Sequence, residues 1–497
     1  MEEFPYSHKY IDIPETSPEN YKAVVKHCLN SIPKLYRDKK VEDFFEVLLP
    51  GKCSRLGIEY PYFDADYLSL YYSYYAKTFR QYKKECCRIV LYGKDNSCLG
   101  YVVLRPLPMG KKIGKTYLDP TVFVSDSCYI ICGPHKLHYL GKEATIYAMP
   151  YMKQEELVTV CAHVCVWSTI RFFSSRFSNH VSHTIGEIAE KIASPFERKT
   201  GLTPKQISAS LVDLGFDSLI LSDGMSTPID EQICAYLDSG LPVICCSSSR
   251  KHAVVACGRA PISADKARRA KIGHMLPHSK RILSFESSLV ERFVVNDDYE
   301  MPYKFIDAKN ISLSLVGEND HGDSSGRRRN KPLSIREIDT CVVPLDRQMQ
   351  LTYPSAKDII EMVFDDTYTT TESNDSYFSS LSIVSSNTFK EWIRENILEG
   401  KLPRSFTRLL WISYPKFLWL GTFSSVDEYC RGECSGFVLL DPTCAINDIS
   451  NVLLIADNVA CRFMENSSEY GDVPMWMFTY EKFAVPLFKK NYVEVRM

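Results

Sequence analysis

Apolar positions in the middle of the chain alternate between helix-like and strand-like stretches. Residues 161–173 (CAHVCVWSTIRFF) form an apolar helical stretch that opens with Cys161. Farther along, Thr203 followed by Pro204 is a helix-start signal, and Gly215 predicts where that helix ends. The pattern therefore predicts helices that cover a sheet built from the strands that follow.

Short runs of apolar and β-branched residues supply those strands. They predict buried strands at 241–248, 251–260, 291–298 and 341–346. The basic stretch 264–281 is interpreted as a loop-like insertion before the third of them. Residues 317–332 contain no apolar residue, which predicts a disordered loop or a long excursion from this part of the chain.

The two flanking parts have a different, mixed pattern. Before residue 150 the pattern predicts a helix at 21–32 and strands at 87–93 and 99–108. After residue 350 it predicts helices at 353–364 and 387–396 and strands at 409–415, 417–423 and 436–443. We therefore expect three parts: an α/β-type unit over 1–150, a central domain over 151–346 that includes the loop 317–332, and an α/β-type unit over 347–497.

Composition narrows the class of protein. The 497 residues carry a formal net charge of −2, with 45% hydrophobic and 24% charged residues, which is ordinary for a globular protein and argues against a nucleic-acid partner. The chain has no stretch of about 18 apolar residues, so the sequence predicts no membrane span. Its N-terminus lacks the pattern of a signal peptide. The 18 cysteines sit mostly in apolar runs, so we expect free thiols in a reducing, cytoplasmic setting.

Four residues in chain order match the needs of thiol chemistry. Cys161 at a helix start would have its thiolate stabilised by the helix dipole and by unpaired backbone N–H groups. His252, at the start of a strand, is the candidate base, and Asp297, at the end of the next strand, can orient its imidazole. Gln154, in a polar segment ahead of the helix, can donate to an oxyanion beside the Cys161 N–H.

Three neighbours compete for two of these roles. Cys165 lies one helical turn after Cys161 and shares its face, but it sits deeper in the apolar run, where a structural role is expected. Asp298 and Asn296 are alternatives to Asp297, because the pattern does not distinguish positions one residue apart at a strand end.

Metal binding is a competing interpretation of the same region. Cys161, His163 and Cys165 are candidate ligands, and Cys430 with Cys434 forms a second C-x3-C pair. Structural zinc sites favour two paired knuckles with four ligands, and on a helix position 163 points away from 161 and 165. We therefore expect neither a metal nor another cofactor.

The order Gln, Cys-Ala-x-x-small, a His opening an apolar strand, and Val-x-Asp resembles the papain-like cysteine peptidase superfamily, closest to the bacteriocin-processing, double-glycine-leader peptidases of bacteria. Over the central domain alone, this resemblance implies an α+β fold in which a Cys-bearing helix packs on an antiparallel sheet that carries His and Asp. It implies roles for Cys161 as nucleophile, His252 as base, Asp297 as its orienter and Gln154 as oxyanion donor. The chain departs from that subgroup at Ala162, where glycine is usual.

These residues predict a cysteine-dependent hydrolase of a bacterial cytoplasm. Attack by Cys161 on a carbonyl carbon would form an acyl-enzyme, and peptide or isopeptide cleavage of a protein substrate is the expected outcome. Acyl transfer, transglutamination and deamidation use the same machinery and remain alternatives. A catalytically inert papain-like interaction protein is the rival class, with the C-terminal unit in a substrate- or partner-recognition role.

Overall fold

The computed structural model describes most of the chain. The described residues are 7–13, 21–48, 52–108, 111–124, 126–155, 157–192, 201–222, 227–269, 273–308, 337–368, 376–443, 451–458, 460–464 and 474–495. The predicted loop 317–332 lies outside them. Within these residues, no helix is long and apolar enough to cross a membrane.

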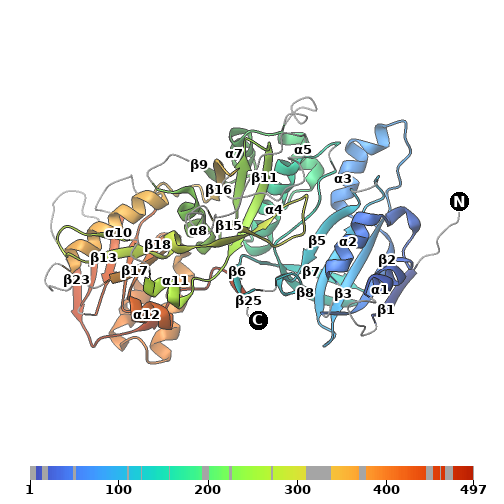
Figure 1. Cartoon of the computed structure of the whole chain (residues 1–497). Helices are drawn as coiled ribbons and strands as arrows, with labels where there is room; N and C mark the ends of the chain where they lie inside the picture. The colour runs from blue at the N-terminus through green and yellow to red at the C-terminus, as the bar shows by residue number, and fades with distance from the viewer. Residues whose placement is uncertain are drawn as a thin grey trace, which may run out of the picture.

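Three β-sheets with their covering helices follow one another along the molecule (Figure 1). Almost all strand pairs in them are antiparallel, and helices pack on the sheets, so the α+β class is confirmed. The two flanking units, expected to be of the α/β type, are also built on mainly antiparallel sheets. The first sheet lies at one end, the central sheet in the middle, and the third sheet at the other end.

The first sheet has the strand order β1-β2-β3-β4-β5. Its elements are β1 (Ser7–Asp12), α1 (Tyr21–Leu29), α2 (Lys39–Leu48), β2 (Cys53–Tyr62), α3 (Ala65–Ser73), β3 (Cys86–Gly93), β4 (Cys98–Leu104) and β5 (Ile113–Leu118). One face of the sheet packs against α1 and α2 in a small separate core. The alternate side chains, such as Val90 and Val103, face the main core of the molecule.

The central sheet has the order β15-β14-β11-β10-β16-β9, and β6 and β25 extend it beside β11. Its strands are β6 (Cys128–Ile130), β9 (Asp217–Ser222), β10 (Val243–Ser247), β11 (His252–Arg259), β14 (Arg292–Asn296), β15 (Lys304–Asp307), β16 (Thr340–Leu345) and β25 (Val493–Val495). The helices of this part are α4 (Cys161–Arg176), α5 (Ile185–Ile192), α7 (Pro204–Asp213) and α8 (Ile229–Asp238). Helix α4 packs on β11, which pairs antiparallel with both β10 and β14.

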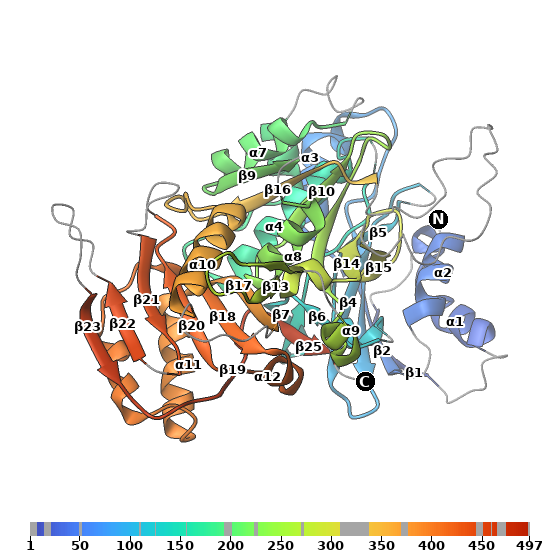
Figure 2. The same ribbon diagram turned by 60° about the vertical axis from the view of Figure 1, so that its left-hand side comes forward.

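The third sheet has the order β12-β13-β17-β18-β20-β21-β22-β23. Its strands are β12 (His274–Met275), β13 (Ile282–Phe285), β17 (Ser376–Ser385), β18 (Phe417–Ser425), β20 (Gly436–Leu440), β21 (Val452–Ala456), β22 (Ala460–Met464) and β23 (Pro474–Thr479). Helices α10 (Tyr353–Thr367) and α11 (Ser386–Leu398) lie by this sheet (Figure 2). They cover opposite faces, because alternate residues of each strand, such as Val438 and Leu439, belong to different cores.

Smaller elements complete the described fold. They are the hairpin of β7 (Gly133–Tyr139) and β8 (Lys142–Ala148), the pair β19 (Glu433–Cys434) and β24 (Val485–Pro486), and the short helices α9 (Ala264–Arg269) and α12 (Val426–Arg431).

Two segments cross the boundaries expected from the sequence. Strands β12 and β13 precede residue 346, yet β13 pairs in parallel with β17 of the third sheet. Strand β25, at the end of the chain, returns to pair with β6 of the central sheet. The side chain of Asn491, just before β25, donates to the carbonyls of Asp238 at the end of α8 and Ile383 in β17, and so joins a helix of the central domain to the third sheet.

Helix-start and helix-end residues in the sequence correctly predicted elements whose ends depend on a short segment. Thr203 caps α7 through the backbone N–H of Gln206, and Gly215 follows that helix with a φ of +99°, as predicted.

The predicted strand over 409–415 is wrong. A 3-10 helix over Arg404–Trp411 occupies its first part and packs Leu409 into the core beside α11. The interpretation of 264–281 as a loop is also wrong, because α9 and β12 fall within it.

A buried carboxylate fixes α4 against the first unit. Asp66 of α3 accepts hydrogen bonds from the Trp167 indole at 2.9 Å and the Ile185 backbone at 3.1 Å, and it pairs with Arg171. Burial raises the pKa of Asp66, but the charges of Lys115 and Arg171 outweigh burial and lower it overall. The carboxylate therefore stays charged and ties α3, α4 and α5 together.

Candidate functional site

Cys161 is the first residue of α4, and the extended backbone of Val160 precedes it. Its side chain is almost buried and lies close to two other thiols, those of Cys165 and Cys246. At the start of α4 the His163 N–H donates to the Val160 carbonyl at 3.0 Å, and the His163 ring accepts the Val160 N–H at 3.2 Å. A carbonyl oxygen brought to Cys161 would meet the N–H groups of the first helical turn and the positive end of the helix dipole.

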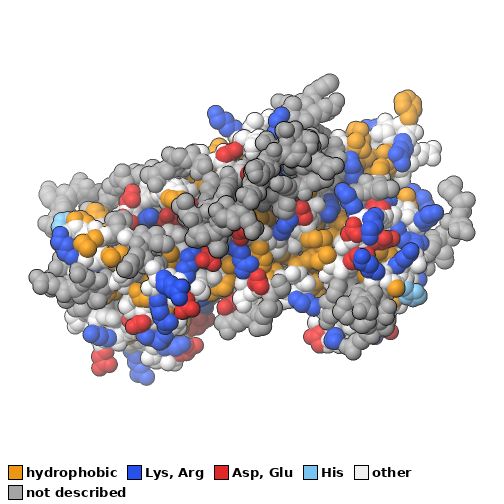
Figure 3. All heavy atoms as spheres, viewed as in Figure 1, with side chains coloured by type: hydrophobic (Ala, Val, Ile, Leu, Met, Phe, Trp, Pro, Cys, Tyr) orange, Lys and Arg blue, Asp and Glu red, His pale blue; other side chains and the backbone are white. Residues whose placement is uncertain are grey.

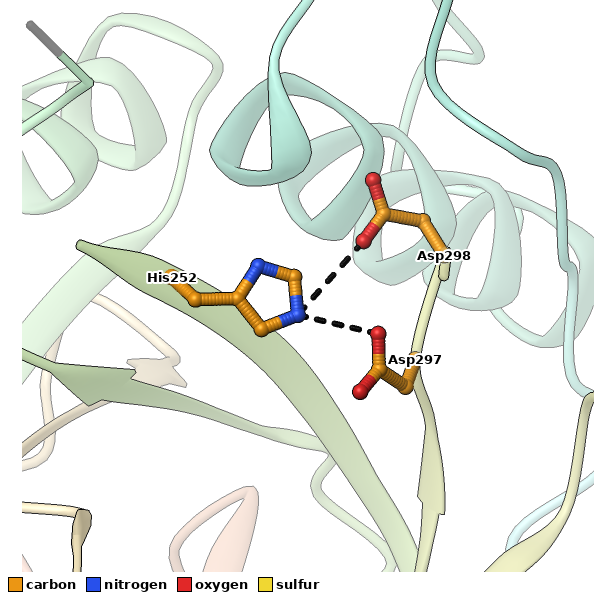
Figure 4. A group of neighbouring side chains, drawn as sticks. All are labelled: His252, Asp297 and Asp298. Atoms are coloured by element: carbon orange, nitrogen blue, oxygen red, sulfur yellow. Dashed lines mark hydrogen bonds and ion pairs between the residues drawn. The ribbon is translucent and has the colours of Figure 1, made fainter. Parts of the chain in front are cut away.

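His252 opens β11, and Asp297 directly follows β14, its antiparallel neighbour. Nε2 of His252 lies 2.9 Å from Oδ1 of Asp297, which also accepts the Tyr299 backbone N–H at 3.0 Å. In Figure 4 this nitrogen faces the carboxylates and Nδ1 lies on the other side of the ring. Asp297 thus holds the ring by Nε2 and leaves Nδ1 for a second partner.

The second partner of His252 is Cys161. Burial by itself lowers the pKa of His252, but hydrogen bonds with Asp297 and with the Cys161 side chain, together with the charges of Asp297 and Asp298, outweigh burial and raise that pKa to about 11. Burial likewise raises the pKa of Asp297, and its bond to His252 reverses this and lowers the pKa below the ordinary value. The site therefore favours an imidazolium beside the Asp297 carboxylate at neutral pH.

The structure separates the two cysteine candidates. Cys165 is one turn deeper in α4, and burial raises the pKa of its thiol well above the ordinary value, with the nearby Cys161 and Asp298 adding to the effect. A thiol of that kind stays protonated near neutral pH. Cys161, beside His252, is the cysteine whose surroundings suit a nucleophile.

The three acceptor candidates also have distinct positions. Asn296 donates to the Pro150 carbonyl and accepts from the Tyr303 backbone at 2.9 Å, so its amide serves the fold. Asp297 binds the His252 ring. Asp298 lies 3.7 Å from the same Nε2, and burial raises its pKa to about 7, with the charge of Asp297 adding to the effect against that of His252.

A small cavity lies beside the Asp298 side chain. It has a volume of about 10 Å³, which is room for roughly one water molecule, and Asp298, Asn296, Ser168 and the Pro150–Met152 segment line it. Both carboxylate oxygens of Asp298 are buried without a hydrogen-bond partner among the described residues. A water molecule in this cavity would supply the partner that the protein does not.

Gln154 is buried in the segment that leads to α4. Among the hydrogen bonds of the described residues, none joins its side chain to Cys161 or His252, so its predicted role as an oxyanion donor stays a prediction. Its neighbour Glu155, which the sequence pattern did not single out, is fully buried and accepts the backbone N–H groups of Val158 at 2.5 Å and Thr159 at 2.7 Å. Glu155 therefore shapes the turn that delivers Cys161.

The exposed ring of Tyr299 lies against the His252 ring. The two ring centroids are 4.9 Å apart, at an angle of 44°. The sequence offers no signal for this contact beyond the position of Tyr299 just after the strand-end carboxylates.

The described residues contain one group with the residue types of a metal site. His252, Asp297 and Asp298 each offer one ligand atom, all within 4.8 Å of one another. Metal binding would have to replace the proton on Nε2 that joins His252 to Asp297, so a metal and the hydrogen-bonded pair exclude each other. The cysteine-containing sets considered as candidate ligands, at 161–165 and at 430–434, form no such group among the residues that the structure describes.

Comparisons with known proteins add no further constraint. No protein-family model, no curated protein and no solved structure matches this chain.

Proposed function

We propose that the chain is a cysteine-dependent hydrolase of the papain-like kind that cleaves peptide or isopeptide bonds. Cys161 is the nucleophile, His252 the proton carrier and Asp297 the group that orients it. The observation that carries the proposal is the series of side-chain hydrogen bonds that runs from Cys161 through His252 to Asp297. The imidazole lies between a thiol at a helix start and a carboxylate 2.9 Å from its far nitrogen.

The charge arrangement supports a thiolate–imidazolium ground state. A His252 pKa of about 11 means that the ring keeps its proton at neutral pH, and Asp297 balances that charge. A proton on Nδ1 stabilises a thiolate beside it, and the helix dipole acts in the same direction.

The reaction follows from these positions. The Cys161 thiolate attacks the substrate carbonyl carbon, and the carbonyl π electrons move to oxygen, which binds the N–H groups at the start of α4 and the amide of Gln154. As the C–N bond breaks, His252 gives its proton to the leaving amine. His252 then takes a proton from water as the water oxygen attacks the thioester carbon. The C–S bond breaks, which releases the carboxylic acid and restores the Cys161 thiolate beside the protonated imidazole.

The decisive test is site-resolved labelling with a limiting amount of iodoacetamide between about pH 6 and 7, read by peptide mass spectrometry. Cys161 should be labelled ahead of the other 17 cysteines. His252→Ala should slow the labelling of Cys161 specifically. His278→Ala is a matched control, because His278 also pairs with a carboxylate, at 2.8 Å from Asp365, away from Cys161.

The result that would overturn the proposal is preferential labelling of another cysteine, or labelling of Cys161 at a rate independent of His252. Cys430, which is more exposed, is the internal reference thiol. Either result would favour the inert interaction protein. Preferential labelling of Cys161 without turnover of a peptide library would instead direct attention to acyl transfer and deamidation, which begin with the same thiolate.

A further inference from the structure

A projecting turn follows α3 at the far end of the first unit. The end of α3 and this turn together expose three aromatic residues and four basic residues, which we call the aromatic-basic tip: Tyr72, Tyr74, Lys77, Phe79, Arg80, Lys83 and Lys84. Phe79 is fully exposed, and 59% of Tyr72 is exposed. Hydrophobic side chains protrude beside Lys and Arg side chains over this end of the molecule (Figure 3).

Ring contacts and a hydrogen bond hold the turn in place against the rest of the first unit. Tyr75 is buried and packs on Tyr82 with ring centroids 4.7 Å apart, and the Arg80 guanidinium lies 5.2 Å from the Tyr82 ring. The Tyr67 hydroxyl donates to the Lys83 carbonyl at 2.8 Å. These contacts fix both sides of the turn, so the exposure of Phe79 at its apex belongs to the folded state.

The tip is strongly basic within a chain that is slightly acidic. Residues 72–85 contain four cations (Lys77, Arg80, Lys83 and Lys84) and one anion, Glu85, which gives +4 − 1 = +3 against −2 for the whole chain. Among the described residues, no ion pair holds any of these four cations. The positive charge therefore faces solvent around an apolar side chain.

We propose that the aromatic-basic tip docks the protein on an anionic lipid bilayer surface. Phe79 would enter the boundary between headgroups and acyl chains, Tyr72 and Tyr74 would lie at headgroup depth, and the four cations would contact anionic headgroups. Aromatic rings with a polar edge concentrate at that depth, and Lys and Arg gain from the negative surface potential.

The shape of the tip favours a bilayer over other anionic partners. A convex apex with one protruding ring can enter a deformable surface, whereas single-stranded nucleic acid binds in a basic groove with a series of stacking rings. A protein partner would need a pocket for the ring, and interface hot spots usually lie at the centre of a broad patch. The proposal is independent of the chemistry at Cys161.

The test is co-sedimentation of the full chain with vesicles of phosphatidylcholine alone or of phosphatidylcholine with phosphatidylserine. We expect binding only to the anionic vesicles, and loss of binding as ionic strength rises. Lys83→Glu with Lys84→Glu should lower the partition coefficient by at least roughly twentyfold, because each cation contributes on the order of fivefold. Phe79→Ser should weaken binding at every ionic strength.

The matched controls are Trp411→Ser, which removes an exposed ring elsewhere, and Lys205→Glu with Lys482→Glu, which makes the same change in net charge at exposed sites. Both should bind as the wild type does. Phe79→Trp reports directly on whether the ring at position 79 enters the bilayer, since its fluorescence emission should shift to the blue on anionic vesicles.

Three outcomes would overturn the proposal. They are no sedimentation with anionic vesicles, equal losses in the tip variants and the controls, or a Phe79→Trp emission that vesicles leave unchanged. Binding of single-stranded RNA that the tip variants abolish, without vesicle binding, would assign the tip to nucleic acid instead.

Discussion

Oδ1 of Asp298 lies 3.7 Å from Nε2 of His252, and Oδ1 of Asp297 lies 2.9 Å from the same nitrogen (Figure 4). Two adjacent carboxylates therefore face one imidazole, and only one of them is hydrogen-bonded to it. Since Asp297 also receives the Tyr299 backbone N–H, its orientation is fixed from two sides. Asp298 contributes charge, while Asp297 contributes charge and position.

This difference predicts unequal effects of two isosteric substitutions. Asp297→Asn should slow alkylation of Cys161 at pH 6 to 7 by about tenfold or more, because the imidazolium loses its hydrogen-bonded anion. Asp298→Asn should slow it by only a few-fold. Second-order rates for the labelled Cys161 peptide would measure both.

Asn296→Asp would complete this comparison, since it adds a third carboxylate at a position that does not face the ring. Equal rates for Asp297→Asn and Asp298→Asn would contradict the assignment of the orienting role to Asp297.

The buried Asp298 carboxyl also predicts a pH-dependent cost to stability. Its folded pKa is about 7 and its ordinary value 3.8, so between these values the unfolded state releases a proton that the folded state keeps. The free energy of unfolding therefore falls as pH rises through this window, by about 4 kcal/mol at most, and the cost is fully present above pH 7. Asp298→Asn should remove this cost, so urea unfolding should show the variant to be more stable than wild type at pH 8 and closer to it at pH 4.

A carboxylate with the opposite shift provides the control. Burial raises the pKa of Asp365, but hydrogen bonds from the Ser279 and His278 segment outweigh it and lower that pKa to about 2. The stability it contributes is present above the ordinary value of 3.8 and is lost as pH falls toward 2, so Asp365→Asn should be less stable than wild type at neutral pH. A gain in both variants would mean that the folded-state pKa of Asp298 is not raised.

The residues of the candidate site that the sequence predicted are those with a local signature. Cys161 opens a helix, His252 opens a strand and Asp297 directly follows another, so alternation and end signals were enough to select them. Antiparallel pairing of β11 with β14 then brings the last two together. The choice between Asp297 and Asp298 needed the path of the backbone after β14, which the hydrophobic pattern does not specify.

The remaining features depend on contacts between distant segments. Tyr75 and Glu155 are 80 positions apart, and β12, β13 and β25 join sheets on the far side of the boundaries expected from composition. Pairings of this kind are set by tertiary packing, and no short window of sequence contains the information. The predicted strand over 409–415 failed for the same reason, since its apolar residues pack against α11 from a 3-10 helix.

The hydrogen bond between Tyr75 and Glu155 predicts a link between the first unit and the nucleophile. The hydroxyl donates to the buried carboxylate at 2.5 Å, and that carboxylate holds the backbone ahead of α4. Tyr75→Phe should lower the free energy of unfolding by about 1.5–3 kcal/mol, the usual contribution of a hydrogen bond to a charged group, and should slow Cys161 alkylation.

Tyr67→Phe is the matched change, because that hydroxyl donates to a neutral backbone carbonyl, at Lys83. It should cost about 0.5–1.5 kcal/mol and leave Cys161 alkylation unchanged. If both variants slowed alkylation equally, the Glu155 turn would have no particular influence on the nucleophile.

The hydrogen-bonded pair of His252 and Asp297 predicts that the site works without a metal. A divalent ion held by His252, Asp297 and Asp298 would occupy Nε2 and leave no proton there for Asp297. Prolonged dialysis against EDTA should therefore leave the Cys161 alkylation rate and the melting temperature unchanged, and elemental analysis of the purified protein should show less than stoichiometric zinc, manganese or iron.

Asp298→Asn separates the alternatives further: a metal site would lose its ion with this substitution, whereas the proton-linked pair keeps its reactive thiol. Stoichiometric metal that disappears in Asp298→Asn, together with slower alkylation after chelation, would replace the thiolate–imidazolium assignment with a metal centre.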